Sequence, residues 1–285
     1  MHLAYDDILR VWEEADELPE LADAWLWDHL MPLAGPPGGA VLEGWTLLAA
    51  LAARTSRLGL GLLVTSNRLR APAHLGKIAT TVDAISHGRL IMGLGVGGTQ
   101  QPEGPNPAVA EYAAYGLSLP RPAEGLARLT ETITILRRMW TEETFDHDGP
   151  FTVLRGTRNG PGPVRPGGPP LLLGGWGDRT LRVVAEHADI WNVPGPPHNS
   201  TDWIAGRARV LDAHCAAIGR DPAEIIRSAQ IIVDYADPAA SRAHVRALVA
   251  AGVRHIVLAL PRPYPPRAAR WLVDEIVDPV RQSVA

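Results

Sequence analysis

The sequence has little cysteine and no excess of either charge. Cys215 is its only thiol, so no disulfide can form within the chain, and a reducing compartment fits. Lys and Arg total 27 against 31 Asp and Glu, a formal net charge of −4. The basic residues are scattered and form no stripe of the kind that neutralises nucleic-acid phosphates. We therefore expect no nucleic-acid partner, and we interpret Cys215 as a helix residue rather than a nucleophile.

Long apolar runs are also missing. No stretch approaches the roughly 20 apolar residues of a membrane-spanning helix, and no charged-then-apolar leader opens the sequence. These absences predict a cytoplasmic protein with no membrane partner. The 46% apolar and 20% charged residues are typical of a globular chain with a large core. Because α/β barrels of roughly 250 residues form one domain, we expect a single domain over residues 1–285.

Helix and strand patterns alternate along the chain, which is typical of a parallel sheet wrapped by helices. The predicted helices cover residues 6–18, 43–54, 72–85, 123–140, 178–187, 201–218, 238–251 and 266–280. The predicted strands cover residues 23–27, 58–64, 90–96, 171–173, 189–192, 225–233 and 254–258. This rhythm predicts an α/β fold of the (β/α)8 TIM-barrel type.

One strand is missing from that count. A (β/α)8 barrel begins with a strand, but only Met1 to Tyr5 precede the first predicted helix. The barrel could be open at this seam, the short segment Leu3-Ala4-Tyr5 could substitute, or another chain could cover the edge, because an unpaired edge is a liability. The pattern does not choose among these, and the last of them agrees with the homodimer that we expect.

Two excursions interrupt the rhythm. A Gly/Pro-rich segment covers about 97–122, and a second segment at about 143–170 contains a predicted hairpin across residues 144–154. Excursions of this length in a compact domain usually carry function or are mobile. We favour a lid for the first of them.

The residues that follow the predicted strands are the candidates for a site, because the active site of such a barrel lies at the carboxyl ends of its strands. Asp28 and His29 form one titratable pair, in which the imidazole could transfer a proton near neutral pH while the carboxylate orients it. A structural turn, with Asp28 capping backbone amides, is the alternative. Thr65, Ser66 and Asn67 follow the next strand.

Two glycine-rich segments also follow strands. Gly174-Gly175-Trp176-Gly177 precedes a predicted helix, so its backbone amides and the helix N-terminus would suit a phosphate; a tight turn explains it equally well. Gly97 and Gly98, after Gly93 and Gly95, could admit a flat ring or form only a bulge. Three other histidines lack a carboxylate cluster at ligand spacing, so we expect no metal: His74, His87 and His187.

Taken together, several segments resemble the bacterial luciferase-like monooxygenase superfamily. In the first half they are Trp25-Leu26-Trp27-Asp28-His29, Trp45 to Thr55, Leu63-Val64-Thr65-Ser66-Asn67 and Gly88-Arg89-Leu90. In the second half they are Leu173-Gly174-Gly175, Thr180-Leu181-Arg182 and Ala185 to Asn192. Within the superfamily, the sequence is most similar to the branch that uses the deazaflavin coenzyme F-420, and FMN is the alternative cofactor.

The resemblance implies hydride transfer between the deazaflavin and a small organic substrate. His29 matches a histidine near the deazaflavin ring, and Leu63-Val64 matches a non-prolyl cis peptide behind the ring. Gly174, Gly175 and Trp176 match the phosphate-side loop. The sugar-phosphate dehydrogenases of this branch carry a glutamate near the position of Gly98, which argues against a sugar-phosphate substrate here. A reduced-FMN monooxygenase and a catalytically silent barrel serving as a binding subunit are the alternative functions.

Overall fold

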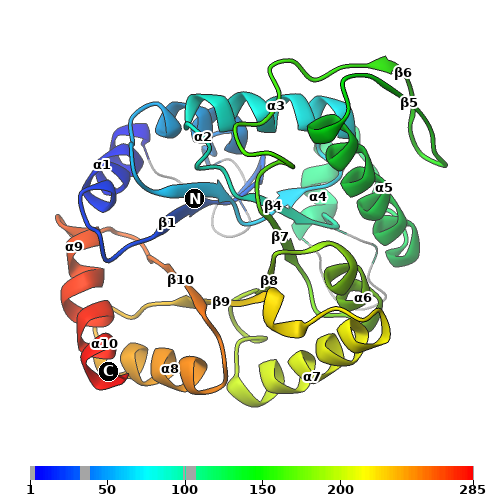
Figure 1. Cartoon of the computed structure of the whole chain (residues 1–285). Coiled ribbons are helices and arrows are strands. Elements are labelled where there is room, and N and C mark those ends of the chain that lie inside the picture. The colour runs from blue at the N-terminus through cyan, green and yellow to red at the C-terminus, as the bar shows by residue number, and fades with distance from the viewer. Residues whose placement is uncertain (1–3, 33–38, 99, 101–106, 285) are drawn as a thin grey trace. The chain divides into compact units, whose positions relative to one another are not determined.

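The computed structural model describes residues 4–32, 39–98, 100 and 107–284. These residues group into two compact units (Figure 1). The first unit contains residues 1–8 and 23–170, and the second contains residues 9–22 and 171–285. The expectation of a single domain over the whole chain stays a prediction.

Parallel strands form the centre of the first unit. They are β1 (Asp23–Leu26), β2 (Gly59–Leu62), β3 (Thr65–Ser66) and β4 (Met92–Gly95). β1 pairs with β2, β3 pairs with β4, and Leu60 bridges Leu90 in the parallel sense. The predicted strand 58–64 is present as β2, and β3 lies just beyond its predicted end. The bond Leu63-Val64 between β2 and β3 is cis, as the resemblance implied. Parallel pairing brings the carboxyl ends of these strands to one edge.

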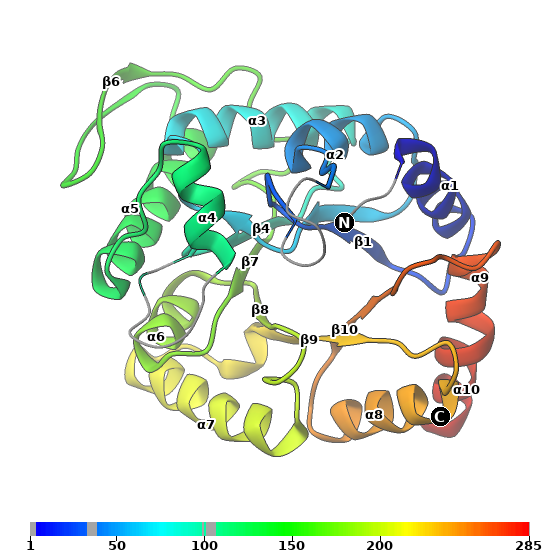
Figure 2. The same cartoon turned by 180° about the vertical axis from the view of Figure 1, so that it is seen from behind.

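The helices of the first unit are α2 (Gly44–Ala52), α3 (Pro72–Ile85), α4 (Pro107–Ala114) and α5 (Pro122–Thr141). Among them, α2 packs against β2 and α3, and α3 packs against α5. α3 begins with Pro72 as predicted, since proline is favoured in the first turn. α4 was not predicted, and it lies within the first excursion, beside α5 in both views (Figures 1 and 2).

The second excursion contains the predicted hairpin. Strands β5 (Phe145–Asp148) and β6 (Val153–Thr157) pair antiparallel. The hairpin extends away from α3 and α5 (Figure 1). The Arg138 guanidinium of α5 lies 4.3 Å from the centre of the Phe145 ring, a cation–π contact that fixes the base of the hairpin to α5.

The second unit repeats strand and helix along one parallel sheet. Its strands are β7 (Leu171–Gly174), β8 (Ile190–Val193), β9 (Ile226–Ile232) and β10 (His255–Ala259), each paired in parallel with the next. Its helices are α6 (Asp178–His187), α7 (Thr201–Ala217), α8 (Pro238–Ala250), α9 (Ala268–Leu272) and α10 (Asp278–Val284), with a 3-10 turn at Pro222–Glu224 and a π turn at Val273–Val277. All seven predicted strands are therefore present.

The start of the chain decides part of the missing-strand question. α1 (Tyr5–Asp16) is the first element of the described residues, and no strand precedes it there. Because Tyr5 already belongs to α1 and Ala4 is not in a strand, neither residue supplies a substitute strand. Leu3, the first residue of the proposed substitute, lies outside the described residues. No helix in the described part of the chain has the length and apolarity needed to cross a membrane.

Candidate functional site at the strand ends of the first unit

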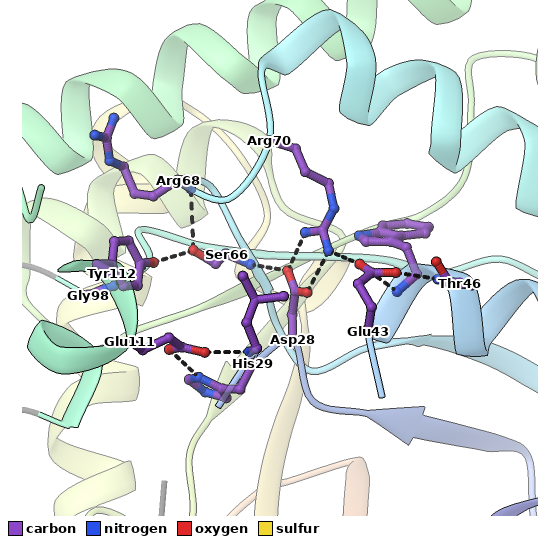
Figure 3. Close-up of polar contacts among 12 residues, drawn as sticks. Asp28, His29, Glu43, Thr46, Ser66, Arg68, Arg70, Gly98, Glu111 and Tyr112 are labelled. Atoms are coloured by element: carbon purple, nitrogen blue, oxygen red, sulfur yellow. Dashed lines mark hydrogen bonds and ion pairs between the residues drawn. The ribbon is translucent and has the colours of Figure 1, made fainter. Parts of the chain in front are cut away.

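Asp28, just beyond β1, is buried and clamps neighbouring segments together. Its Oδ2 accepts hydrogen bonds from the Ser66 backbone N–H at 2.9 Å and from Arg70 Nη1 at 2.7 Å, and its Oδ1 accepts from Arg70 Nη2 at 2.9 Å. A bidentate pair of this kind is geometrically specific. The clamp therefore fixes the end of β1 against β3 (Figure 3).

Arg70 extends the clamp to α2. It also pairs with Glu43, whose carboxylate accepts from the backbone N–H groups of Trp45 and Thr46 and so caps α2. Burial alone would lower the pKa of Arg70, but the hydrogen bonds and charges of Asp28 and Glu43 raise it overall. Arg70 consequently stays charged, as its two carboxylate partners require.

The expected pairing of Asp28 with His29 is wrong. Both Asp28 oxygens are engaged by Ser66 and Arg70, and the carboxylate that holds His29 is Glu111 of α4, with Oε2 lying 2.9 Å from His29 Nδ1. A buried carboxylate needs a charged or hydrogen-bonding partner, and Arg70 supplies it to Asp28 in bidentate form. These contacts agree with the structural alternative that the sequence offered for Asp28, and its role stays a prediction.

Glu111 is almost fully buried and makes three contacts. Besides His29, its Oε1 accepts from the backbone N–H groups of Leu30 at 2.5 Å and Met31 at 3.2 Å. Burial raises the pKa of Glu111, but the hydrogen bonds from these three residues outweigh burial and lower it overall. His29 itself keeps 29% of its side chain exposed, and no described residue hydrogen-bonds to its Nε2.

Tyr112, the next residue of α4, fastens the excursion to the strand ends. Its hydroxyl lies 2.5 Å from Ser66 Oγ and accepts from the Gly98 backbone N–H at 3.3 Å. The ring belongs to a small apolar cluster with Ala108 and Leu119. The part of the first excursion that the structure describes is therefore packed in place, and whether it acts as a lid stays a prediction.

The segment after β2 leaves polar groups without partners. Leu63, Thr65, Ser66 and Asn67 are buried and Val64 partly so. Thr65 Oγ1 and both side-chain polar atoms of Asn67 have no hydrogen-bond partner among the described residues. Buried polar groups in native proteins nearly always have a partner. A ligand with polar edges would fit such a donor and acceptor set.

The glycines after β4 make room for protein atoms. Gly97 has φ +74°, and a Cβ there would lie 2.6 Å from both Ser66 Oγ and Tyr112 Oη. A Cβ on Gly98 would meet Leu119 and Ala108 of the excursion at under 3 Å. A side chain at either position would therefore collide with neighbouring segments, and the flat ring and the bulge that the sequence left open stay predictions.

The glycine loop after β7 belongs to the second unit. Gly175 has φ +141°, and a Cβ on Gly177 would meet only Thr180 Oγ1, at 3.7 Å. Gly177 precedes α6 and supplies no side-chain cap. Trp176 is partly exposed and stacks on His198 at 4.4 Å between ring centroids. Phosphate binding by Gly174, Gly175, Trp176 and Gly177 stays a prediction.

Cys215 is buried, and burial raises the pKa of its thiol, as suits a core residue.

The sequence reasoning missed Glu111, Tyr112 and Arg70. α4 had a usable signal, since Pro107 opens an alanine-rich segment with high helix propensity. Within it Glu111 and Tyr112 are the only strongly polar side chains, yet both are buried while Val109 is exposed. Burial of the polar side chains and exposure of an apolar one indicate a helix whose polar side chains have partners inside the protein. Arg70 follows no pattern that would have identified it.

A family model described as luciferase-like monooxygenase matches residues 3–276. The chain belongs to this family. Among curated relatives, the phthiodiolone/phenolphthiodiolone dimycocerosates ketoreductase of Mycobacterium sp. (strain JLS) is 32% identical over 202 residues, covering 70% of this chain and 49% of the relative. The chain thus spans about half the length of the curated relatives that it matches.

Solved structures share the fold of this chain. An F-420-dependent secondary alcohol dehydrogenase in complex with an F-420–acetone adduct has a TM-score of 0.82 at 14% identity, covering 98% of this chain and 96% of that one. A riboflavin lyase with modified FMN and substrate riboflavin has a TM-score of 0.76 at 15% identity, covering 97% and 85%. At these identities the likeness establishes the fold alone. It confirms the predicted (β/α)8 TIM-barrel class.

Proposed function

We propose that this luciferase-like chain is a deazaflavin-dependent oxidoreductase that interconverts a ketone and a secondary alcohol in a small organic substrate. Membership of the family supports a redox enzyme. Several curated relatives are named as ketoreductases, and a solved structure of the same fold is named as a secondary alcohol dehydrogenase that uses coenzyme F-420. Together they favour a carbonyl group as the reacting centre.

His29 is the observation that carries the proposal. It stands just beyond the carboxyl end of β1, where the active sites of such barrels lie, with Nδ1 held by a carboxylate and Nε2 bound by no described residue. In the oxidising direction, the alcohol carbon loses a hydride while Nε2 accepts the hydroxyl proton, and the C–O bond becomes a carbonyl. In the reducing direction, the carbonyl carbon gains a hydride and Nε2 returns the proton to oxygen.

The residues around His29 fit a bound deazaflavin. When bound, the coenzyme supplies a two-electron hydride acceptor or donor. The unpartnered hydroxyl of Thr65 and carboxamide of Asn67 are the side chains that would hydrogen-bond a polar ring edge. Leu63 and Val64 would supply the apolar surface behind it.

Titration of the purified protein with coenzyme F-420 and, separately, with FMN tests the proposal. We expect quenching of deazaflavin fluorescence on binding, and loss of the oxidised deazaflavin absorbance when a secondary alcohol is added. Formation of one ketone for each deazaflavin reduced would account for both electrons of the transferred hydride. Binding of neither cofactor would contradict the proposal and favour the catalytically silent binding subunit.

A reduced-FMN monooxygenase is the second candidate, favoured by the family description and by the FMN-containing neighbour. Tight FMN binding without F-420 binding, together with oxygen consumption, would decide for it.

We also propose a homodimer, which sedimentation equilibrium would test, and a cytoplasmic location, which fractionation of the source cells would test.

A further inference from the structure

The two oxygens of Glu111 have different partners. Oε1 accepts from the backbone N–H groups of Leu30 and Met31, whereas Oε2 alone faces His29 Nδ1. The backbone contacts fix the carboxylate plane and direct its second oxygen at the imidazole (Figure 3). This arrangement leaves the carboxylate little freedom to turn away from the histidine.

We propose that Glu111 is the positioning residue of the site and holds His29 as the Nδ1–H tautomer, so that Nε2 carries the lone pair that takes the substrate proton. An ionised carboxylate can only accept a hydrogen bond, so Nδ1 must donate. The catalytic consequence rests on the function proposed above, but the tautomer itself does not.

The surroundings keep Glu111 ionised. Burial opposes the charge, yet the contacts with His29, Leu30 and Met31 outweigh burial and leave the pKa below its ordinary value of 4.5. Near neutral pH the group is therefore an anion, and a tautomer with a lone pair on Nδ1 would place two acceptors 2.9 Å apart. Such a contact is repulsive, which favours the other tautomer.

α4 delivers Glu111 to the site from the first excursion. The neighbouring Tyr112 anchors the helix through Ser66 Oγ and the Gly98 backbone N–H, and the Tyr112 ring packs with Ala108 and Leu119. The first excursion thus contributes a working part of the site: with α4 in place the Glu111 carboxylate is fixed on His29.

Nitrogen NMR of the histidine side chains tests the tautomer without any cofactor. A free neutral imidazole favours the proton on Nε2, so a wild-type His29 that is protonated on Nδ1 supports the proposal. A wild-type His29 protonated on Nε2 overturns it. This measurement on the wild-type protein does not depend on the folding of any variant. Assignment by comparison with His29→Gln identifies the signals.

Glu111→Gln sharpens the test because glutamine has the same shape. Its single oxygen should keep the Leu30 and Met31 contacts, which turns the NH2 group toward His29 Nδ1. Since that group donates, the imidazole must accept on Nδ1 and carry its proton on Nε2. We therefore expect the tautomer to invert, and an unchanged tautomer in a folded variant would overturn the proposal.

Glu131→Gln is the matched control, because Glu131 is the other buried glutamate of the first unit that contacts a histidine and two backbone N–H groups. It should leave the His29 signals unchanged.

In turnover assays Glu111→Gln should lower kcat by about 10² to 10⁴ with little change in KM. If wild type shows no turnover, the proposed function fails, while the NMR still decides the role of Glu111.

Discussion

Glu111 and Glu131 each accept hydrogen bonds from a histidine and from two backbone N–H groups that are consecutive in the chain. Both are buried. Glu111 lies in the first excursion, and Glu131 contacts residues of the second. The first set of partners is His29, Leu30 and Met31, and the second is His147, Phe151 and Thr152. The two constellations use their atoms differently: Glu111 accepts from the backbone on Oε1 and faces His29 Nδ1 with Oε2, whereas Oε1 of Glu131 makes all three contacts and meets His147 Nε2. They also differ in what surrounds them.

His29 follows a parallel strand, beside the Asp28 clamp and the segment with unpartnered polar groups. His147 lies inside β5 of an antiparallel hairpin and is less exposed, at 13% against 29%. There the glutamate closes the hairpin turn against α5. A carboxylate–imidazole contact therefore does not by itself identify an active site, and the position of His29 at the strand ends is what makes it the candidate.

Replacing each histidine gives the largest expected contrast. His29→Ala should lower turnover by about 10² to 10⁴, because the group that exchanges the substrate proton is lost. His147→Ala should leave turnover near the wild-type value. Steady-state kinetics with the cofactor identified by titration measures both, and equal losses in the two variants would remove the distinction between the regions.

Arginine replacements compare how firmly the two regions are held. Arg70→Ala leaves the buried Asp28 carboxylate without its charged partner, so we expect the free energy of unfolding to fall by about 3 to 5 kcal/mol. Arg155 pairs with Asp148 on the exposed face of the hairpin, and Arg155→Ala should have no measurable effect. Urea denaturation at neutral pH gives both values. A negligible loss for Arg70→Ala would contradict the clamp.

How much of this was predictable depends on whether the information is local. The strand and helix rhythm is local, so all seven predicted strands and helices such as α3 and α6 appear as expected. The position of His29 followed from its place after a strand. Its partner did not, because Glu111 lies 82 residues away in the chain, and no periodicity links the two. Contacts of Asp28 with Ser66 and Arg70 were hidden for the same reason.

Glycine replacements separate steric overlap from backbone strain. Gly97 and Gly156 both have positive φ. A Cβ on Gly97 would lie 2.6 Å from Ser66 Oγ and from Tyr112 Oη, whereas a Cβ on Gly156 would meet nothing within 4 Å. Gly156→Ala should cost about 1 kcal/mol for the left-handed backbone. Gly97→Ala should cost about 1 to 3 kcal/mol more, from overlap with the anchor of α4. Thermal unfolding ranks the two, and equal losses would contradict tight packing at Gly97.

The pH dependence of stability gives the smallest contrast and concerns Glu111 alone. Its pKa in the folded protein lies below the ordinary value of 4.5, so the unfolded chain binds a proton more readily than the folded one. Its contribution to stability is therefore fully present above the unfolded pKa and is lost as the pH falls through the lower, folded pKa. Glutamine cannot ionise, so the difference in unfolding free energy between wild type and Glu111→Gln should shrink as the pH falls from about 7 to about 3. A difference that stays constant over this range would show that the three hydrogen bonds do not stabilise the anion.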